Sequence, residues 1–212
     1  MLIFSDLKLA YIAVPKTGTT AVSMALKPRA DIIFSKGRKH MNAQRFHTKI
    51  APFLLDTFDF VPECVAVIRD PIEQIRSWYK YRNGPRQKNT SRGTHGCSFD
   101  DFVLATLSNN PPDFARIGNQ YKMLTSGNLS KDGRVLVHHL FAYENQKQFL
   151  NFLNERFEKE VVLKRKNVSP DASAPLSPKT EAKLRAYRAR EFALYDSVLQ
   201  AGGHLRSVVD AV

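Results

Sequence analysis

The sequence has little cysteine, no long apolar run and no internal repeat. The two cysteines, Cys64 and Cys97, offer neither a disulfide framework nor a Cys/His metal site, which favours a reducing compartment. No apolar run approaches the roughly 18 residues of a membrane span, and Met1–Asp6 lacks the features of a signal peptide. These absences predict a soluble, cytoplasmic protein with no transmembrane segment.

Acidic residues are also scarce, with 20 Asp and Glu against 32 Lys and Arg, for a formal net charge of +12. Such an imbalance indicates an acidic partner: a nucleotide, a nucleic acid, an anionic glycan or a membrane surface. The chain lacks an aromatic-basic RNA motif and a recognition helix, so nucleic acid is not the expected partner. Two stretches concentrate the cations, namely Lys36, Arg38, Lys39, Arg76, Lys80, Arg82, Arg86, Lys88 and Arg92.

Strand-like and helix-like segments alternate along the chain, which predicts an α/β fold with a mainly parallel central sheet between helices. At 212 residues the chain is expected to form one domain, 1–212, with a mobile basic loop at 82–97 and a C-terminal helix at 178–201 as appendages. The predicted strands are 8–14, 32–34, 65–68, 135–137 and 161–163. The main predicted helices are 19–26, 72–81, 102–107, 119–125, 143–157 and 178–199.

The segment Pro15–Thr20 (PKTGTT) joins the first predicted strand to the first predicted helix. Free N–H groups at a helix N-terminus attract anions, Gly18 permits close approach of a ligand, and Lys16 adds a full charge. The spacing is not that of a Walker A loop, in which lysine directly follows the second glycine. An ordinary strand-to-helix turn therefore remains an alternative when this segment is considered alone.

A second strand-to-helix junction carries Arg69, with Ser77 about two turns into the following helix. Arginine offers a planar fork to a phosphate, and serine offers a short donor. The alternatives are a salt bridge from Arg69 to Asp70 or Glu73, and a packing role for Ser77. Because ligands of parallel sheets bind beyond the carboxyl ends of the strands, both junctions are predicted to border one crevice.

Together the two junctions resemble the sulfotransferases that use 3′-phosphoadenosine 5′-phosphosulfate (PAPS), of the bacterial and glycan-directed type. The resemblance implies a P-loop, nucleotide-kinase-like fold, PAPS as sulfuryl donor, 3′-phosphoadenosine 5′-phosphate as product, and no required metal. Less specific similarities lie at Phe141–Glu144, Asn167–Ser169 and Glu191–Asp196. The donor-binding residues that the resemblance implies are Lys16, Thr17, Gly18, Thr19 and Thr20 for the 5′-phosphosulfate, and Arg69 and Ser77 for the 3′-phosphate.

The family transfers a sulfuryl group to an acceptor hydroxyl or amine, which implies a cation at the leaving phosphate and a base. Lys16 is the expected cation. The base is expected between the two motifs, where His40 precedes the predicted helix cap Asn42, a position that favours neutral imidazole. His47 lies beside an apolar helix stripe, where packing is the more natural role, and Glu63 is a carboxylate alternative.

The surplus of cations predicts an anionic acceptor, such as a glycan or glycoconjugate bearing carboxylate or sulfate groups. A solvated basic loop that aids solubility is the alternative. Two other function classes remain: a P-loop kinase or NTPase, which lacks its Walker motifs here, and a basic nucleic-acid-binding module. Family members of the secretory pathway usually carry a membrane anchor, so a prokaryotic-type enzyme is expected. The acceptor, the oligomeric state and the role of loop Lys164–Pro170 stay open.

Overall fold

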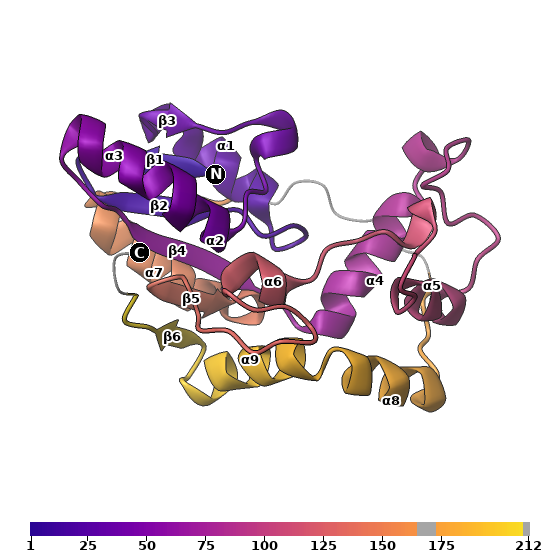
Figure 1. Cartoon of the computed structure of the whole chain (residues 1–212). Helices are drawn as coiled ribbons and strands as arrows, with labels where there is room; N and C mark the ends of the chain where they lie inside the picture. The colour runs from indigo at the N-terminus through magenta and orange to yellow at the C-terminus, as the bar shows by residue number, and fades with distance from the viewer. Residues whose placement is uncertain (165–172, 210–212) are drawn as a thin grey trace.

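A six-stranded mixed sheet forms the centre of the protein, with strand order β3-β1-β2-β4-β5-β6 (Figure 1). The computed structural model describes residues 1–164 and 173–209. Its strands are β1 (Leu2–Phe4), β2 (Leu9–Ile12), β3 (Ile32–Ile33), β4 (Glu63–Ile68), β5 (His139–Ala142) and β6 (His204–Arg206).

Only the three middle strands of this sheet are parallel. β2 pairs in parallel with β4, and β4 with β5, whereas β1, β3 and β6 join the sheet through antiparallel pairings. The prediction of a mainly parallel sheet is therefore wrong at both edges. At the edge that contains β1, the reason is the short connection from β1 to β2. The Lys8 N–H donates to the Ser5 carbonyl (2.9 Å) in a tight turn, which leaves no room for the crossover helix that parallel strands need.

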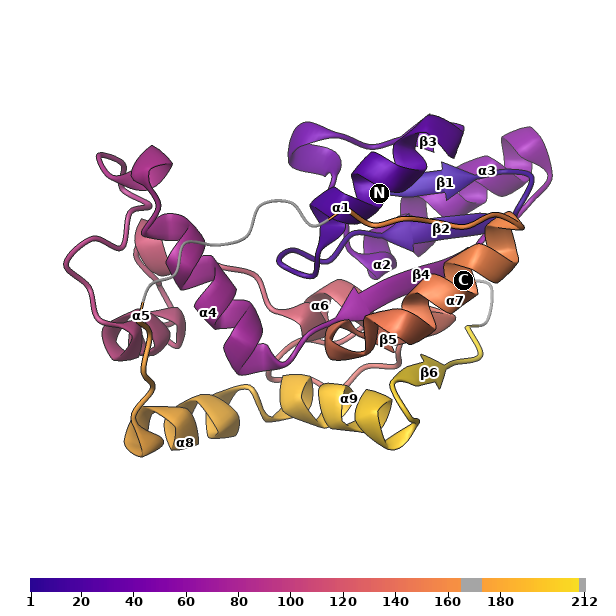
Figure 2. The same cartoon turned by 180° about the vertical axis from the view of Figure 1, so that it is seen from behind.

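Helices cover both faces of the sheet, as Figures 1 and 2 show from opposite sides. α1 and α7 pack on one face, and α2, α3, α6 and α9 pack on the other. Each face of the sheet thus carries one apolar cluster. Along β2, Leu9 and Tyr11 belong to the cluster on the α1 and α7 face, whereas Ala10 and Ile12 belong to the cluster on the opposite face, as the alternation of a strand requires. The α-helices are α1 (Thr19–Leu26), α2 (Ala43–Arg45), α3 (Ala51–Phe58), α4 (Pro71–Arg82), α5 (Phe99–Thr106), α6 (Gln120–Leu124), α7 (Gln146–Phe157), α8 (Pro178–Tyr187) and α9 (Ala189–Gln200).

A third apolar cluster lies beside the sheet, where α4, α5 and α8 meet (Figure 1). Ile75 and Tyr79 of α4 pack there with Phe102 of α5 and Leu184 of α8. This cluster anchors α4, which begins three residues after β4 ends at Ile68. The third cluster thus fixes the helix that carries the second predicted motif.

Several predicted elements match the structure closely, and others do not. α1 has the predicted bounds, and α4 extends the predicted helix 72–81 by one residue at each end. The predicted strand 135–137 is wrong: Val135 makes only an isolated bridge with Thr125, and the strand is β5. The predicted strand 161–163 is also wrong, since the N–H of buried Val161 donates to the Asn154 side chain (2.7 Å) instead.

The predicted helix 178–199 is interrupted at Arg188, which ends α8 and precedes α9. Arg188 is 2 % exposed and leaves helical geometry at φ −105° and ψ 26°. Over residues 1–164 and 173–209, no helix has both the length and the apolarity needed to cross a membrane.

Candidate functional site

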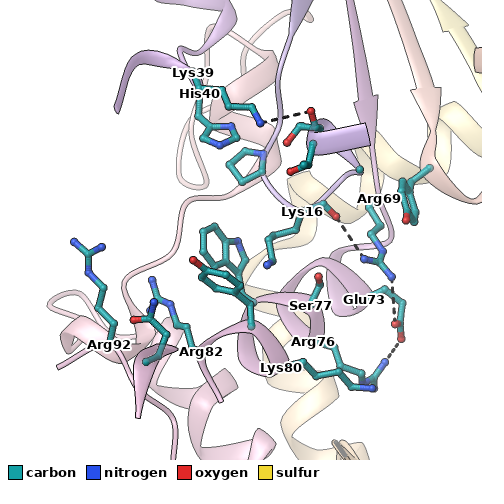
Figure 3. Close-up of a pocket in the computed structure, with 18 of the residues that line it drawn as sticks. Lys16, Lys39, His40, Arg69, Glu73, Arg76, Ser77, Lys80, Arg82 and Arg92 are labelled. Atoms are coloured by element: carbon teal, nitrogen blue, oxygen red, sulfur yellow. Dashed lines mark hydrogen bonds and ion pairs between the residues drawn. The ribbon is translucent and has the colours of Figure 1, made fainter. Parts of the chain in front are cut away.

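The three parallel strands deliver side chains to one cavity at their carboxyl ends. Arg69 directly follows β4, Tyr143 directly follows β5, and the loop after β2 carries Lys16. All three line a cavity of about 790 Å³ (Figure 3). The cavity therefore joins the two motifs that the sequence places about fifty residues apart. Of the donor-binding and catalytic residues predicted from the sequence, those lining it are Lys16, Gly18, Thr19, Thr20, His40, Arg69 and Ser77.

The loop after β2 needs its glycine for two reasons. Gly18 caps α1 with φ 74°, a left-handed conformation that side chains rarely adopt. A Cβ at this position would also lie 3.2 Å from the ring of Tyr143. Thr17 does not line the cavity: it is 2 % exposed, and its hydroxyl donates to the Val14 carbonyl (2.8 Å). The Thr17 side chain therefore holds the loop.

Lys16 carries its amino group over two aromatic rings of α4. The Nζ atom lies 4.0 Å from the ring centroid of Tyr81 and 5.0 Å from that of Trp78. Partial burial, together with the positive charges of Arg69 and Arg82, lowers the pKa of Lys16 to about 8. The charged form is thus poorly compensated here, so an anion entering the cavity would favour it.

Arg69 is positioned by weak contacts that leave its guanidinium at the cavity wall. The guanidinium lies over the Tyr143 ring at 4.6 Å, and Nη1 donates to the Lys16 carbonyl at 3.4 Å. Carboxylate oxygens of Glu73 and Glu144 lie 3.9 and 4.0 Å away. The ion pair considered from the sequence therefore forms with Glu73, at a distance typical of a weak pair.

The backbone of Arg69 is held by a buried side-chain amide. Gln120, which has no exposed surface, accepts a hydrogen bond from the Arg69 N–H (2.9 Å) and donates one to the Arg69 carbonyl (2.8 Å). Glu191 of α9 in turn accepts from the side chain (3.2 Å) and the backbone N–H (3.0 Å) of Gln120. Arg188 completes the chain by donating to Glu191 at 3.2 Å. We call Arg69, Gln120, Glu191 and Arg188 the buried clamp.

Replacing Gln120 by leucine is expected to lower the free energy of unfolding by about 2–3 kcal/mol, because it leaves buried partners without hydrogen bonds. Urea denaturation followed by circular dichroism measures this difference. Gln146→Leu at the exposed start of α7 is the matched control and should leave the free energy of unfolding nearly unchanged. Equal effects of the two substitutions would contradict the stabilising role assigned to the clamp.

α4 presents one face to the cavity and is tied to the loop after β2. Asp70 caps α4 by accepting from the Glu73 N–H (2.9 Å), and Gln74 donates to the Pro15 carbonyl (3.2 Å). Ser77 and Tyr81 both line the cavity, as expected for residues one turn apart. These contacts fix the distance between the two motifs.

Arg76, considered from the sequence as a weaker candidate than Ser77, lines the cavity but has other partners. Its guanidinium pairs with Glu73, and its Nε donates to the Ala174 carbonyl (3.1 Å). Arg82 is similarly committed: it is 6 % exposed and donates to the carbonyls of Asp113, Phe114 and Arg116. Both cations therefore hold neighbouring segments in place as well as contributing positive potential.

The segment after α4, predicted as a surface loop, is anchored on α4 through Thr94. Thr94 is 1 % exposed, and its hydroxyl donates to the Tyr79 carbonyl (3.2 Å). The Thr94 N–H donates to the Arg82 carbonyl at 3.3 Å. This anchor brings Arg86 and Arg92 to the cavity wall.

His40 lies at the cavity wall with one ring nitrogen fixed (Figure 3). Its Nδ1–H donates to the Ala13 carbonyl at 2.7 Å, so the neutral ring keeps a lone pair on Nε2. Although the residue is exposed, the protein packed against the ring lowers its pKa, chiefly by desolvation and also through the charge of Lys39. The geometry thus supplies a neutral imidazole with a free acceptor atom.

The other candidate bases lie elsewhere. His47 is 4 % exposed in the core, where its Nε2–H donates to the Leu136 carbonyl (2.8 Å). Glu63 begins β4, at the end of the strand opposite to the cavity, and pairs with Arg156 at 2.7 Å. Neither residue lines the cavity.

Sequence reasoning missed Tyr143, Trp78 and Gln120. Tyr143 could have been found, since it follows a parallel strand as Arg69 does. Trp78 could also have been found, since it adjoins Ser77 on the same predicted helix. Gln120 gave no signal, because only the folded chain brings it to Arg69. The loop residues Asn167 and Ser169, with most of Lys164–Pro170, lie outside the described residues.

A scan of the chain against protein-family models found no match, and neither did a search among curated proteins. Within the described part of the chain, no cluster of three or more His, Cys, Asp or Glu side chains is arranged to hold a metal ion.

Proposed function

We propose that this protein is a sulfotransferase that moves the sulfuryl group of PAPS to an acceptor hydroxyl on an anionic carbohydrate. The observation that carries the proposal is the convergence of Lys16, Arg69 and Ser77 on one cavity, with His40 at its wall. A P-loop, nucleotide-kinase-like fold belongs to the same proposal, and the parallel order of β2, β4 and β5 supports it.

The charge and size of the cavity suit a donor with phosphate groups at two ends. Eight of its lining residues are Lys or Arg, whereas Glu73 is the single lining carboxylate among the described residues. Its volume of about 790 Å³ lies within the range of about 300–1,000 Å³ found for small-ligand sites. The loop after β2 would bind the 5′-phosphosulfate, and Arg69 with Ser77 would bind the 3′-phosphate.

The proposed reaction is a direct transfer between two oxygen atoms. The acceptor oxygen forms a bond to sulfur while the bond from sulfur to the 5′-phosphate oxygen breaks, and the bonding electron pair stays on that phosphate oxygen. Lys16 stabilises the charge that develops there. His40 takes the acceptor proton on Nε2, the ring atom that its bond to Ala13 leaves free.

The product 3′-phosphoadenosine 5′-phosphate should bind with a Kd of about 1 μM, equivalent to about −8.2 kcal/mol, in the presence of a chelator. Two separate phosphate sites explain this expectation, since adenosine 5′-phosphate lacks the group that Arg69 and Ser77 would hold. Isothermal titration calorimetry of both nucleotides measures the difference. The matched variant Arg69→Ala should weaken only the binding of the bisphosphate.

Magnesium ATP serves as the competing ligand in the same titration. Tighter binding of magnesium ATP than of the bisphosphate would support a P-loop kinase or NTPase instead. An absence of bisphosphate binding would remove the basis of the sulfotransferase proposal.

A further inference from the structure

A second cavity, of about 480 Å³, lies next to the first, and His40 belongs to the lining of both. This second cavity is formed by α2 and α6 together with the segments that lead into these two helices. No other residue is shared between the two linings within the described parts of the chain. A group bound in one cavity and a group bound in the other can therefore meet at the His40 imidazole.

Every charged residue that lines the second cavity in the described structure is a cation: Arg38, Arg45 and Lys122. All three are exposed, and none of their side chains has a hydrogen-bond or ion-pair partner among residues 1–164 and 173–209. Arg76 and Arg82 in the first cavity, by contrast, donate to backbone carbonyls. The second cavity thus keeps cations whose charge is not compensated by the fold, as a site for a carboxylate or sulfate group requires.

Two asparagines add neutral donors of fixed orientation. The Asn42 side-chain oxygen accepts from the Arg45 N–H (2.9 Å), and that of Asn119 accepts from the Lys122 N–H (2.7 Å). With both oxygens engaged, the two amide NH₂ groups remain to donate, and both residues line the cavity. Hydroxyl and carboxylate oxygens are suitable acceptors for such groups.

The remaining lining is aliphatic and lacks aromatic rings. Met41, Ile117 and Met123 supply apolar surface, which can contact the C–H face of a sugar ring. Proteins that bind single-stranded nucleic acids usually stack bases on aromatic side chains, and no Phe, Tyr or Trp lines this cavity in the described structure. The lining therefore favours an anionic carbohydrate over a nucleic acid.

We infer that the second cavity binds the acceptor, a carbohydrate bearing carboxylate or sulfate groups, and that His40 is the point at which acceptor and donor meet. This inference rests on the proposed function and deepens it. Of the cations expected from the sequence to bind the acceptor, at residues 36–39 and 76–92, this inference keeps Arg38, and it adds Arg45 and Lys122.

The test is an amide NMR titration of the full chain saturated with 3′-phosphoadenosine 5′-phosphate. The probes are chondroitin and heparin hexasaccharides, with carboxyl-reduced chondroitin as the neutral counterpart. The anionic probes should shift the amides of Gly37, Gly118 and Asn119, and the reduced probe should not. The double variant Arg45→Glu/Lys122→Glu should weaken the binding of the anionic probes, raising their Kd about tenfold or more. The charge-matched control Lys49→Glu/Lys131→Glu, whose residues line neither cavity, should not.

Shifts confined to residues 86–92, equal weakening by both double variants, or no shift with either anionic probe would overturn the inference. A hexanucleotide RNA that shifts the cavity amides more strongly than the glycans would also overturn it. Calorimetry of the bisphosphate on each variant is run first. Normal bisphosphate binding with shifts elsewhere contradicts only the acceptor site, whereas absent bisphosphate binding contradicts the proposed function.

Discussion

His40→Ala is expected to lower kcat by about 10²–10⁴-fold, the usual loss when a general base is removed. The reason is that the Ala13 carbonyl fixes Nδ1 as the donor, so that Nε2 is the atom able to accept the acceptor proton. Affinity for 3′-phosphoadenosine 5′-phosphate should change little, because the phosphate contacts are assigned to other residues. Steady-state sulfate transfer from labelled PAPS, with calorimetry on the same preparation, measures both quantities.

The pH dependence separates a base from a residue that only shapes the cavity. A base must be neutral, so activity is lost as pH falls through its pKa. Desolvation lowers the pKa of His40 below its usual value of 6.5, so the acid limb of kcat/KM should lie below pH 6.5. Added imidazole should restore part of the rate of His40→Ala. His95→Ala, at an exposed histidine, is the control and should behave as the parent protein.

Normal turnover of His40→Ala together with an inactive His47→Ala would reverse this assignment. His47 is buried and bonded to the Leu136 carbonyl, so circular dichroism must first show that the His47 variant is folded.

Lys16→Ala is expected to lower kcat by about 10²–10³-fold, the range seen when a donor to developing negative charge is removed. Its contact with the leaving phosphate oxygen strengthens only as the sulfur–oxygen bond breaks, so donor affinity should fall much less than kcat. Arg69→Ala should give the opposite pattern, a weakened donor Kd with a smaller change in kcat. Single-turnover and binding measurements on the two variants distinguish these patterns.

The pKa of Lys16, lowered to about 8 by desolvation and by two guanidinium groups, gives a second signature. The charged amine is the active form, so kcat/KM should decline as pH rises through about 8 in the free enzyme. A bound anionic donor favours the charged amine, so the basic limb of kcat should lie at higher pH. Near-normal kcat in Lys16→Ala, with this basic limb retained, would contradict the catalytic role.

The sequence predicts the two junctions well because their signals are local. The bounds of α1 follow from apolar residues behind Gly18, and α4 follows from Asp70 as cap with proline in its first turn. The convergence of both junctions follows from one rule of parallel sheets, and β2 and β4 obey it.

The parts that the sequence did not predict depend on tertiary contacts. Residues 135–137 have strand-like composition, but the Leu136 N–H donates to the Leu124 carbonyl (2.8 Å) and not to a strand of the sheet. For this segment, strand pairing with β4 begins only at β5. The break between α8 and α9 follows from burial of Arg188 against Glu191, a contact that helix propensity does not reveal. The second cavity joins residues 37–45 to residues 117–123, which no local pattern connects.

The buried clamp bears on how this chain can be recombined with others. α9 contributes no residue to the lining of either cavity, yet Glu191 holds the amide that fixes the Arg69 backbone. A chimera that takes its C-terminal helices from a divergent sequence would keep the described cavity walls and could still lose the position of Arg69. Libraries and grafts built on this scaffold should therefore transfer positions 69, 120, 188 and 191 as one block.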